Sequence, residues 1–444
     1  MKKESNLGKL SEKKFNKNIQ NWISPEGVIF NDKKSEKLYK ERVNRLKYAI
    51  KLEKVPDRVP ILLNVTFFPT YYYNISPKLA MYNYEILYQS WKKFLLEFEP
   101  DSAPGPHIGS GKFFEILGSQ NYAWPGHGVG EEYSFQFIEA EYMKENEYDI
   151  FIKDTSDFIV RNYLPRIFKK LKGLKYLISI NEMLSGHVSN FIQFSKPEIR
   201  EGLNFLLDAG NEAAKWGEAT KTFKKEIMAA GFPIFGGAVA LAPFDIIGNY
   251  LRGTRGIMID IYRQPKKLLE ALEIATSISI KMGLSNLRSR SNNPVVYMPL
   301  HKGGDDFLSK KQYETFYWPY LKEVILTLIK NGYFVYLFAE GSYNSRLKFI
   351  RELPVGKTMW RFDQTDMGNA KKELKDIACI AGNLPISLLI TGSTEDVKEY
   401  VKNMIKLVSK DGGYIMCNGA GIDKAKPENI KAMIKYTQKY GSYN

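Results

Sequence analysis

Short apolar runs alternate with helix-like segments along most of this chain. Eight runs are apolar enough for strands buried on both faces, and they lie near residues 60–67, 101–105, 234–241, 295–300, 333–339, 358–363, 378–382 and 413–418. Segments such as SKKQYETFYWPYLKEVILTLIKNG lie between them and carry apolar residues at helical spacing. Strands that are apolar on both faces and alternate with helices indicate a parallel sheet.

Eight such strands predict an α/β fold of the (β/α)₈ type, a TIM barrel. A doubly wound open sheet is the alternative, because the strand count alone does not exclude it. Residues 106–233 predict a large insertion of helices and loops between the second and third strands. The first 40 residues or so are polar and predict a loosely attached extension, followed by a lead-in helix. We therefore expect an N-terminal region over 1–54 and a barrel over 55–444.

Composition and charge narrow the class of protein. The 444 residues are 44% hydrophobic, which excludes disorder for most of the chain. The net charge of +15 favours an acidic partner, but the charges are scattered and no nucleic-acid motif is present. Two cysteines exclude a disulfide framework and favour a reducing compartment. The N-terminus lacks an apolar signal segment, and the longest uncharged run, 228–244, is interrupted by glycines and prolines. We expect a cytoplasmic protein without membrane or nucleic-acid partners.

Polar residues follow the last five predicted strands, at the ends where a parallel barrel carries its chemistry. They are His301, Asp305 and Asp306, then Glu340, Asp363 and Asp366, and finally Asn383, Cys417 and Asn418. A single acid of this kind is often a helix cap or a surface salt bridge, but five strands together predict one shared pocket. Asp363 and Asn383 would contact a substrate there. Glu340 ends the run GYFVYLFAE, and Gly341 lets the chain turn sharply after it.

Aromatic residues follow the first strand in FFPTYYYN, and a turn-rich loop reads WPGHGVG. One interpretation makes Phe68, Tyr71, Tyr72, Trp124 and His127 the wall of a substrate pocket, because flat apolar rings exclude water and suit an aromatic ligand. The other makes the aromatic cluster plain core and His127 a structural histidine. The segment GPHIGSGKFF is not a phosphate loop, because its spacing is one residue short and Phe113 replaces Ser or Thr.

Several segments together resemble the uroporphyrinogen decarboxylase superfamily. They are VPDRVPI, LRGTRGIMIDIYRQPKKLLEA, GGDDFLSKKQYETFYWPYLKEVI, EGSYNSRL, AGNLPISLL and AKPENIKAMI, and the resemblance extends from Val55 to Tyr443. It implies a (β/α)₈ barrel, and a homodimer is common in the superfamily. The decarboxylases carry an Arg-Gln-Ala-Gly-Arg signature near the N-terminus, and nothing like it occurs near residues 60–80.

The second branch of the superfamily contains methyltransferases that work with a separate corrinoid protein. Members that methylate thiols bind zinc through His-x-Cys and a later Cys, and here these positions read Phe338, Glu340 and Ala420. The chain is more similar to the members that take a methyl group from a substrate, such as an aromatic methyl ether, and hand it to cobalt. The resemblance thus implies a corrinoid cofactor carried by a partner protein.

Removal of a methyl group from oxygen requires that the departing oxygen be neutralised, by a proton or by a metal. In one arrangement Glu340, with a pKa raised by burial, is the general acid and His301 or Asp306 assists it. In the other, Glu340, His301 and Cys417 hold Zn²⁺ with an open fourth position. A tetrapyrrole decarboxylase and a non-catalytic corrinoid- or tetrapyrrole-binding protein are the alternative functions.

Overall fold

The computed structural model describes residues 2–102, 105–106, 108–288 and 293–443. Seven parallel strands form one curled sheet in the order β1-β10-β9-β8-β7-β6-β5. They are β1 (Ile61–Leu62), β5 (Ala238–Val239), β6 (Val295–Leu300), β7 (Phe334–Ala339), β8 (Thr358–Phe362), β9 (Cys379–Ala381) and β10 (Tyr414–Cys417). Sequence neighbours are spatial neighbours, and the first strand pairs with the last. A doubly wound sheet would reverse its order at a switch point, so the barrel prediction is confirmed and that alternative is wrong.

The second barrel position, between β1 and β5, is occupied by Asp101 and Ser102. Ser102 pairs in parallel with Leu62, and the Asp101 N–H donates to the Ile61 carbonyl at 3.0 Å. On its other side, Ser102 Oγ donates to the carbonyl of Pro233, shortly before β5, at 3.4 Å. Residues 103–104 of the strand predicted over 101–105 lie outside the described residues. All eight positions of the barrel are therefore accounted for.

The two faces of the sheet belong to two separate hydrophobic clusters, because side chains alternate along each strand. The inward cluster contains Leu62, Val295, Phe334, Tyr336, Met359, Cys379, Ala381, Ile415 and Cys417. The outward cluster contains the intervening residues, among them Val296, Val335, Leu337, Ala339, Trp360, Phe362, Ile380 and Met416. A residue two positions beyond an inward side chain therefore also faces the barrel axis, which determines what reaches the rim.

Helices after each strand cover the outer face. Those after β1 are α3 (Phe68–Tyr72), α4 (Pro77–Tyr82) and α5 (Tyr84–Phe98), and those after β5 are α11 (Pro243–Asp245), η6 (Ile246–Leu251), α12 (Gly253–Arg263) and α13 (Pro265–Arg288). The later ones are α14 (Lys310–Gln312), η7 (Tyr313–Tyr317), α15 (Trp318–Lys330), η8 (Asn344–Arg346), α16 (Leu347–Ile350), α17 (Met367–Leu374), α18 (Ile386–Thr391), α19 (Thr394–Val408) and α20 (Pro427–Tyr440). Ser309 caps α14, and Gly332, with φ +89°, lets the chain turn after α15.

The N-terminal helices α1 (Lys2–Ile23) and α2 (Lys33–Lys51) cover the N-terminal end of the barrel. Phe15 and Trp22 are buried and pack against Phe334, the first residue of β7, with ring centroids 4.5 and 6.5 Å away. Both helices share the inward hydrophobic cluster of the strands. The prediction of a loosely attached extension is therefore wrong. Apolar residues at positions 15, 19 and 22 give α1 one buried stripe in an otherwise polar sequence.

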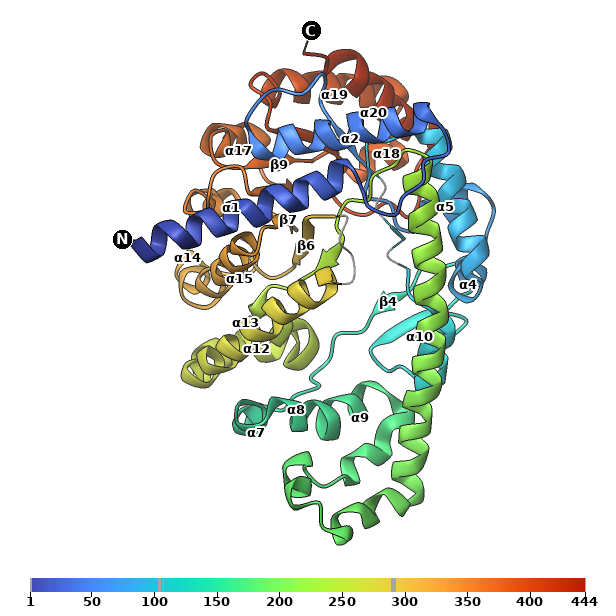
Figure 1. Ribbon diagram of the computed structural model, residues 1–444, viewed down its shortest axis with the longest axis vertical. Coiled ribbons are helices and arrows are strands. Elements are labelled where there is room, and N and C mark those ends of the chain that lie inside the picture. The colour runs from blue at the N-terminus through green and yellow to red at the C-terminus, as the bar shows by residue number, and fades with distance from the viewer. Residues whose placement is uncertain (1, 103–104, 107, 289–292, 444) are drawn as a thin grey trace.

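The insertion is mainly helical, as predicted, and it also forms a small three-stranded sheet. Its strands are β2 (Tyr122–Pro125), β3 (Gly128–Val129) and β4 (Gln136–Phe137), in the order β3-β2-β4. Its helices are α6 (Gly111–Leu117), η1 (Glu145–Glu147), α7 (Tyr148–Lys153), α8 (Thr155–Phe158), η2 (Ile159–Tyr163), α9 (Leu164–Ile167), η3 (Lys169–Tyr176), η4 (Ile180–Ser185), η5 (Val188–Ser195) and α10 (Pro197–Ala229). Figure 1 shows α10 running along one side of the molecule, with the segment between α9 and α10 at the end away from the barrel.

None of the described helices combines the length and the apolar character needed to cross a membrane.

Candidate functional site

A histidine–carboxylate pair lies at the carboxyl ends of two neighbouring strands. Leu300 of β6 pairs with Ala339 of β7, so the residues that follow them, His301 and Glu340, lie side by side. Glu340 is two residues beyond the inward-facing Phe338, and it therefore also faces the barrel axis. His301 Nδ1 lies 2.7 Å from Glu340 Oε2, and 38% and 48% of the two side chains remain exposed. The predicted convergence of these two residues is confirmed, and Gly341 turns the chain with φ +77°.

The contact between His301 and Glu340 shifts the pKa values of the two groups in opposite directions. The hydrogen bond from His301 holds the pKa of Glu340 below its usual value, and the positive charges of His301 and Arg361 add to this effect. Burial lowers the pKa of His301, but the bond to Glu340 and the negative charges of Asp245 and Glu340 outweigh burial and raise it. The expectation that burial raises the pKa of Glu340 is wrong, because the bond from His301 outweighs burial.

The turn that carries His301 is fixed from below by Asp245, which is fully buried. Its carboxylate accepts the backbone N–H groups of His301 at 2.7 Å and Lys302 at 3.1 Å. Lys302 in turn donates to Glu139 at 2.8 Å and to Thr254 at 2.6 Å. Sequence reasoning missed Asp245 and Lys302. A signal was present, because Asp245 follows the third predicted strand in LAPFD as Glu340 follows the fifth.

Three other predicted site residues, Asp363, Asn383 and Asp306, differ in how close they lie to the pair. Asp363 accepts the Gly341 N–H at 3.4 Å, and burial, with help from the nearby Glu340 charge, raises its pKa, so it adjoins the pair. Asn383 donates to the carbonyls of Asp363 and Thr365 at 3.1 and 3.0 Å, which fixes the neighbouring loop. Asp306 is exposed, and in the described part of the chain no hydrogen bond or ion pair joins it to His301 or Glu340.

A buried arginine that the sequence analysis missed lies in the barrel below the pair. Arg361 is 1% exposed, and its guanidinium lies 3.7 Å from the ring centroid of Phe338. With the Asn64 amide oriented so that its oxygen faces the guanidinium, this oxygen accepts from both terminal nitrogens at 2.7 and 3.0 Å. Nε has no partner, and no carboxylate in the described part of the chain forms an ion pair with Arg361. Its place two residues before Asp363 in MWRFDQTD indicates the same inward face.

Zinc does not fit the predicted ligand set of Glu340, His301 and Cys417. Cys417 is fully buried, and burial raises the pKa of its thiol despite the positive charge of Arg361. Among the residues that the structure describes, no group of three His, Cys, Asp or Glu side chains could hold a metal ion.

The aromatic residues predicted as a pocket wall lie elsewhere. Phe68 is 2% exposed and packs edge-on against Phe94 and Phe98 of α5, with Tyr72 stacked on it at 5.7 Å. The core interpretation is therefore correct for these two residues, because α3 is a helix and turns them towards α5.

The remaining three aromatic predictions involve the small sheet of the insertion. The Tyr71 hydroxyl donates to the carbonyl of Glu132, before β4. Trp124 is buried and stacks on His127 across the turn between β2 and β3, with ring centroids 4.5 Å apart. Trp124 Nε1 also donates to the hydroxyl of Tyr82 at 3.2 Å. Nothing in these contacts joins the three residues to the His301–Glu340 pair.

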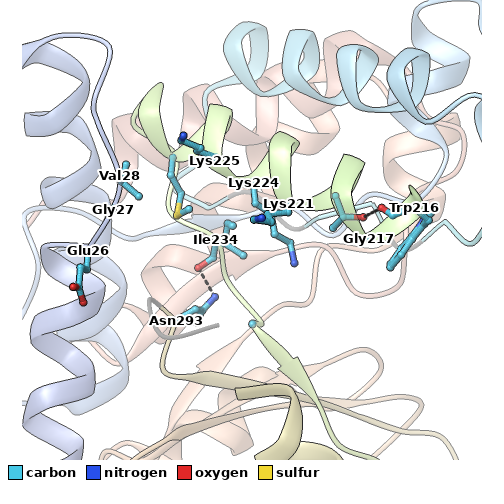
Figure 2. Close-up of a pocket in the computed structure, with 13 residues that line it drawn as sticks. Glu26, Gly27, Val28, Trp216, Gly217, Lys221, Lys224, Lys225, Ile234 and Asn293 are labelled. Atoms are coloured by element: carbon cyan, nitrogen blue, oxygen red, sulfur yellow. Dashed lines mark hydrogen bonds between the residues drawn. The ribbon is translucent and has the colours of Figure 1, made fainter. Parts of the chain in front are cut away.

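An apolar cavity of about 420 Å³ lies at the opposite end of the barrel (Figure 2). It lies between the linker that joins α1 to α2, one face of α10, and the segments that precede β5 and β6. Figure 2 shows Lys221 and Trp216 of α10 on one side and Asn293 on the other, where the Asn293 amide donates to the carbonyl of Ile234 at 2.8 Å. Because the pair lies at the carboxyl ends of β6 and β7, this cavity is a separate feature.

Comparison with known proteins agrees with this geometry. A solved structure, a methyltransferase from Methanosarcina mazei, has a similar fold, with a TM-score of 0.58 and 15% sequence identity over 91% of this chain and 98% of that chain. A search of curated proteins found no match. The sequence model of the uroporphyrinogen decarboxylase (URO-D) family matches residues 195–440. This match covers more than half of the 444 residues and includes the strands that carry His301, Glu340 and Arg361, so the chain belongs to the uroporphyrinogen decarboxylase family.

Proposed function

We propose that this protein transfers a methyl group from a small methylated substrate, an aromatic methyl ether, to the Co(I) of a corrinoid carried by a separate protein. The observation that carries the proposal is the half-exposed His301–Glu340 pair, in which a 2.7 Å contact joins the imidazole to the carboxylate and raises the pKa of the imidazole. The family membership and the likeness in fold to a methyltransferase support it. The Arg-rich signature of the decarboxylases is missing, which weighs against a tetrapyrrole decarboxylase.

In this proposal His301 neutralises the leaving oxygen. As the methyl–oxygen bond breaks, the oxygen keeps the bonding electrons and takes the proton from the Nε2 side of the His301 ring. Glu340 holds the Nδ1 side at 2.7 Å and stabilises the charged form of the ring until transfer. Asp245 fixes the backbone of His301 and thereby the position of the proton. General acids of this kind contribute about 10²–10⁴-fold to rate.

The corrinoid, when its carrier protein is bound, supplies the nucleophile that accepts the methyl group. The exposure of both side chains of the pair is compatible with this, because a group carried by another protein needs an open rim. A closed site would demand a resident cofactor. Since the zinc ligand set does not fit, no step of the proposed reaction relies on a metal ion of this chain.

Support for an aromatic substrate comes from the rings inside the barrel rather than from the predicted wall. Tyr297 and Tyr336 have ring centroids 5.0 Å apart, and Phe338 lies above Tyr336 on the same inward row, directly before Glu340. Tyr297 and Tyr336 are tilted by 50° to each other, and together with Phe338, whose ring the Arg361 guanidinium contacts, they offer an aromatic floor below His301. Such a floor suits an arene and keeps water from the reacting bond.

The deciding experiment mixes the protein with reduced cob(I)alamin and a panel of methoxylated aromatics, and follows the loss of Co(I) absorbance. We expect methyl transfer from at least one member of the panel. His301→Gln should lower kcat/KM about 10²–10⁴-fold, and His187→Gln, a change of an exposed histidine in the insertion, should leave it unchanged. If no methylated compound reacts and the protein instead forms coproporphyrinogen from uroporphyrinogen, the decarboxylase alternative is correct.

A further inference from the structure

An exposed cluster of large apolar side chains lies on the insertion between α9 and α10. It consists of Ile180, Leu184, Val188, Phe191 and Ile192, which are 61, 94, 75, 47 and 63% exposed, and we call it the apolar tip. Soluble proteins rarely expose large contiguous apolar patches unless the patch contacts a partner. Ile180 and Leu184 lie on η4, the other three residues lie on η5, and these two short helices contact each other.

The tip stands on a well-bonded polar frame. Gln193 is buried, its Oε1 accepts the N–H of Ile178 at 2.8 Å, and its Nε2 donates to the carbonyl of Asn190 at 2.8 Å. Asn190 Nδ2 in turn donates to the carbonyl of Glu182 at 2.6 Å. These bonds tie η4 to η5. The apolar side chains are therefore held outward by a defined structure.

Cations flank the tip along the chain. Residues 169–201 contain six Lys or Arg and three Glu, and Lys172, Lys175 and Lys196 are exposed. A second copy of this chain would bring the same cations to the contact, and like charges across an interface oppose association. An anionic lipid surface offers the complementary arrangement, because headgroups attract the lysines while the acyl region accepts the apolar side chains.

The position of the tip also favours a bilayer. Figure 1 shows the green segment between α9 and α10 at the end of the molecule farthest from both chain termini. Leu184 is 94% exposed, so no other part of the described chain covers it. A flat surface can therefore meet the tip without meeting the barrel.

We propose that the apolar tip inserts into the surface of an anionic membrane and attaches the protein peripherally. The barrel and its rim stay in water in this arrangement. The proposal goes beyond the proposed methyl transfer and does not depend on it. It departs from the sequence-based expectation of no membrane partner, because the pattern of residues 177–195 contains no long apolar run and only the structure exposes these side chains together.

The test is co-sedimentation of the full chain with vesicles of phosphatidylcholine containing about one third phosphatidylglycerol. We expect binding to these vesicles, about tenfold weaker binding to pure phosphatidylcholine, and release at about 1 M salt, where charges are screened over roughly 3 Å. The double variant Leu184→Asp/Val188→Asp should bind at least about tenfold more weakly, because both carboxylates would enter the acyl region. The control is Leu407→Asp on α19, a leucine outside the tip that is 57% exposed, and it should bind as the wild type does.

Three results would overturn the proposal. The first is a wild-type chain that does not sediment with the anionic vesicles. The second is equal binding by the double variant and the wild type, which would assign the binding to the general positive charge. The third is a wild-type dimer in light scattering that the double variant converts to a monomer, which would make the tip an interface between two copies. Circular dichroism on each variant checks that the fold is retained.

Discussion

At the scale of single residues, the His301–Glu340 pair shows how two titratable groups set each other's protonation. Each group stabilises the charged form of the other, so the pKa of Glu340 is lowered and that of His301 is raised. Both groups are therefore charged over the pH range between the lowered pKa of Glu340 and the raised pKa of His301. The raised pKa of His301 results from its partners rather than from burial, which lowers it.

This arrangement predicts the pH dependence of methyl transfer. In the proposed reaction the imidazolium is the acid, so the rate should fall as pH rises through the raised pKa of His301, and it should fall at low pH where Glu340 takes a proton. In Glu340→Gln the carboxylate that raises the pKa of His301 is gone, so the basic limb should move to lower pH. Profiles of kcat/KM against pH measure both limbs. A basic limb at the same pH in Glu340→Gln would contradict the assignment of the donor.

Arg361 predicts a shift of the other limb. Its charge helps to lower the pKa of Glu340, so Arg361→Met should raise that pKa and move the acidic limb to higher pH. Arg361→Lys keeps the charge and should leave the limb near its wild-type position, although it loses the two-nitrogen contact with Asn64. The comparison separates electrostatics from folding, because both substitutions disturb packing but only one removes the charge. Equal acidic limbs in the two variants would refute this role.

Sequence reasoning reached some of these residues and missed others for identifiable reasons. Strand ends predicted His301 and Glu340 because parallel strands share one rim. Arg361 was missed because the prediction considered only residues that follow a strand. Arg361 lies within a strand, on the same face as Asp363. The protonation of the pair could not be predicted, because it depends on a 2.7 Å contact between residues 39 positions apart.

At the scale of elements, α1 is part of the barrel core although most of its residues are polar. Its apolar residues occur at positions 15, 19 and 22, the spacing of one helical face, and this signal was available in the sequence. The aromatic segment after β1 shows the reverse case. Phe68 and Tyr72 are four residues apart, so they share one face of a helix and pack on α5 instead of pointing at the rim.

The role of α1 predicts a large loss of stability on truncation of Trp22. This side chain is fully buried against Phe235 and Phe334, and Trp22→Ala should lower the free energy of unfolding by about 3–5 kcal/mol. Ile29→Ala in the following linker is the control, because Ile29 is 81% exposed and its truncation should change stability by less than about 0.5 kcal/mol. Urea unfolding followed by fluorescence or circular dichroism gives both values. A loss of similar size in the two variants would contradict the packing described for α1.

At the scale of the whole molecule, one buried carboxylate joins the N-terminal helices to the barrel. Asp101 is fully buried at the second strand position, and it accepts from Arg45 of α2 at 2.7 Å and from Arg58 at 2.6 and 2.8 Å. It also accepts the N–H of Ile61 at 2.8 Å. The same residue therefore connects α2, β1 and the segment between β1 and β5.

Loss of this carboxylate should destabilise the whole fold. Asp101→Asn leaves two guanidinium groups without their buried counter-ion, and we expect a loss of about 3–5 kcal/mol in the free energy of unfolding. Asp149→Asn is the matched control, because Asp149 is 72% exposed in its ion pair with Lys267 and such pairs contribute about 0–1 kcal/mol. Denaturant titration of both variants provides the measurement. An Asp101→Asn protein as stable as the control would show that the network is dispensable.

The helices α1 and α2 cover the N-terminal end of the barrel, so ligands cannot enter from that end. Under the proposed function, the ether and the carrier protein must both reach the site from the other end of the barrel. The bound carrier protein would then block the entry of the ether. The ether must then enter first and the demethylated product must wait for the carrier to depart. Under the proposed function, excess carrier protein should slow turnover by trapping empty enzyme, an effect that more ether would relieve.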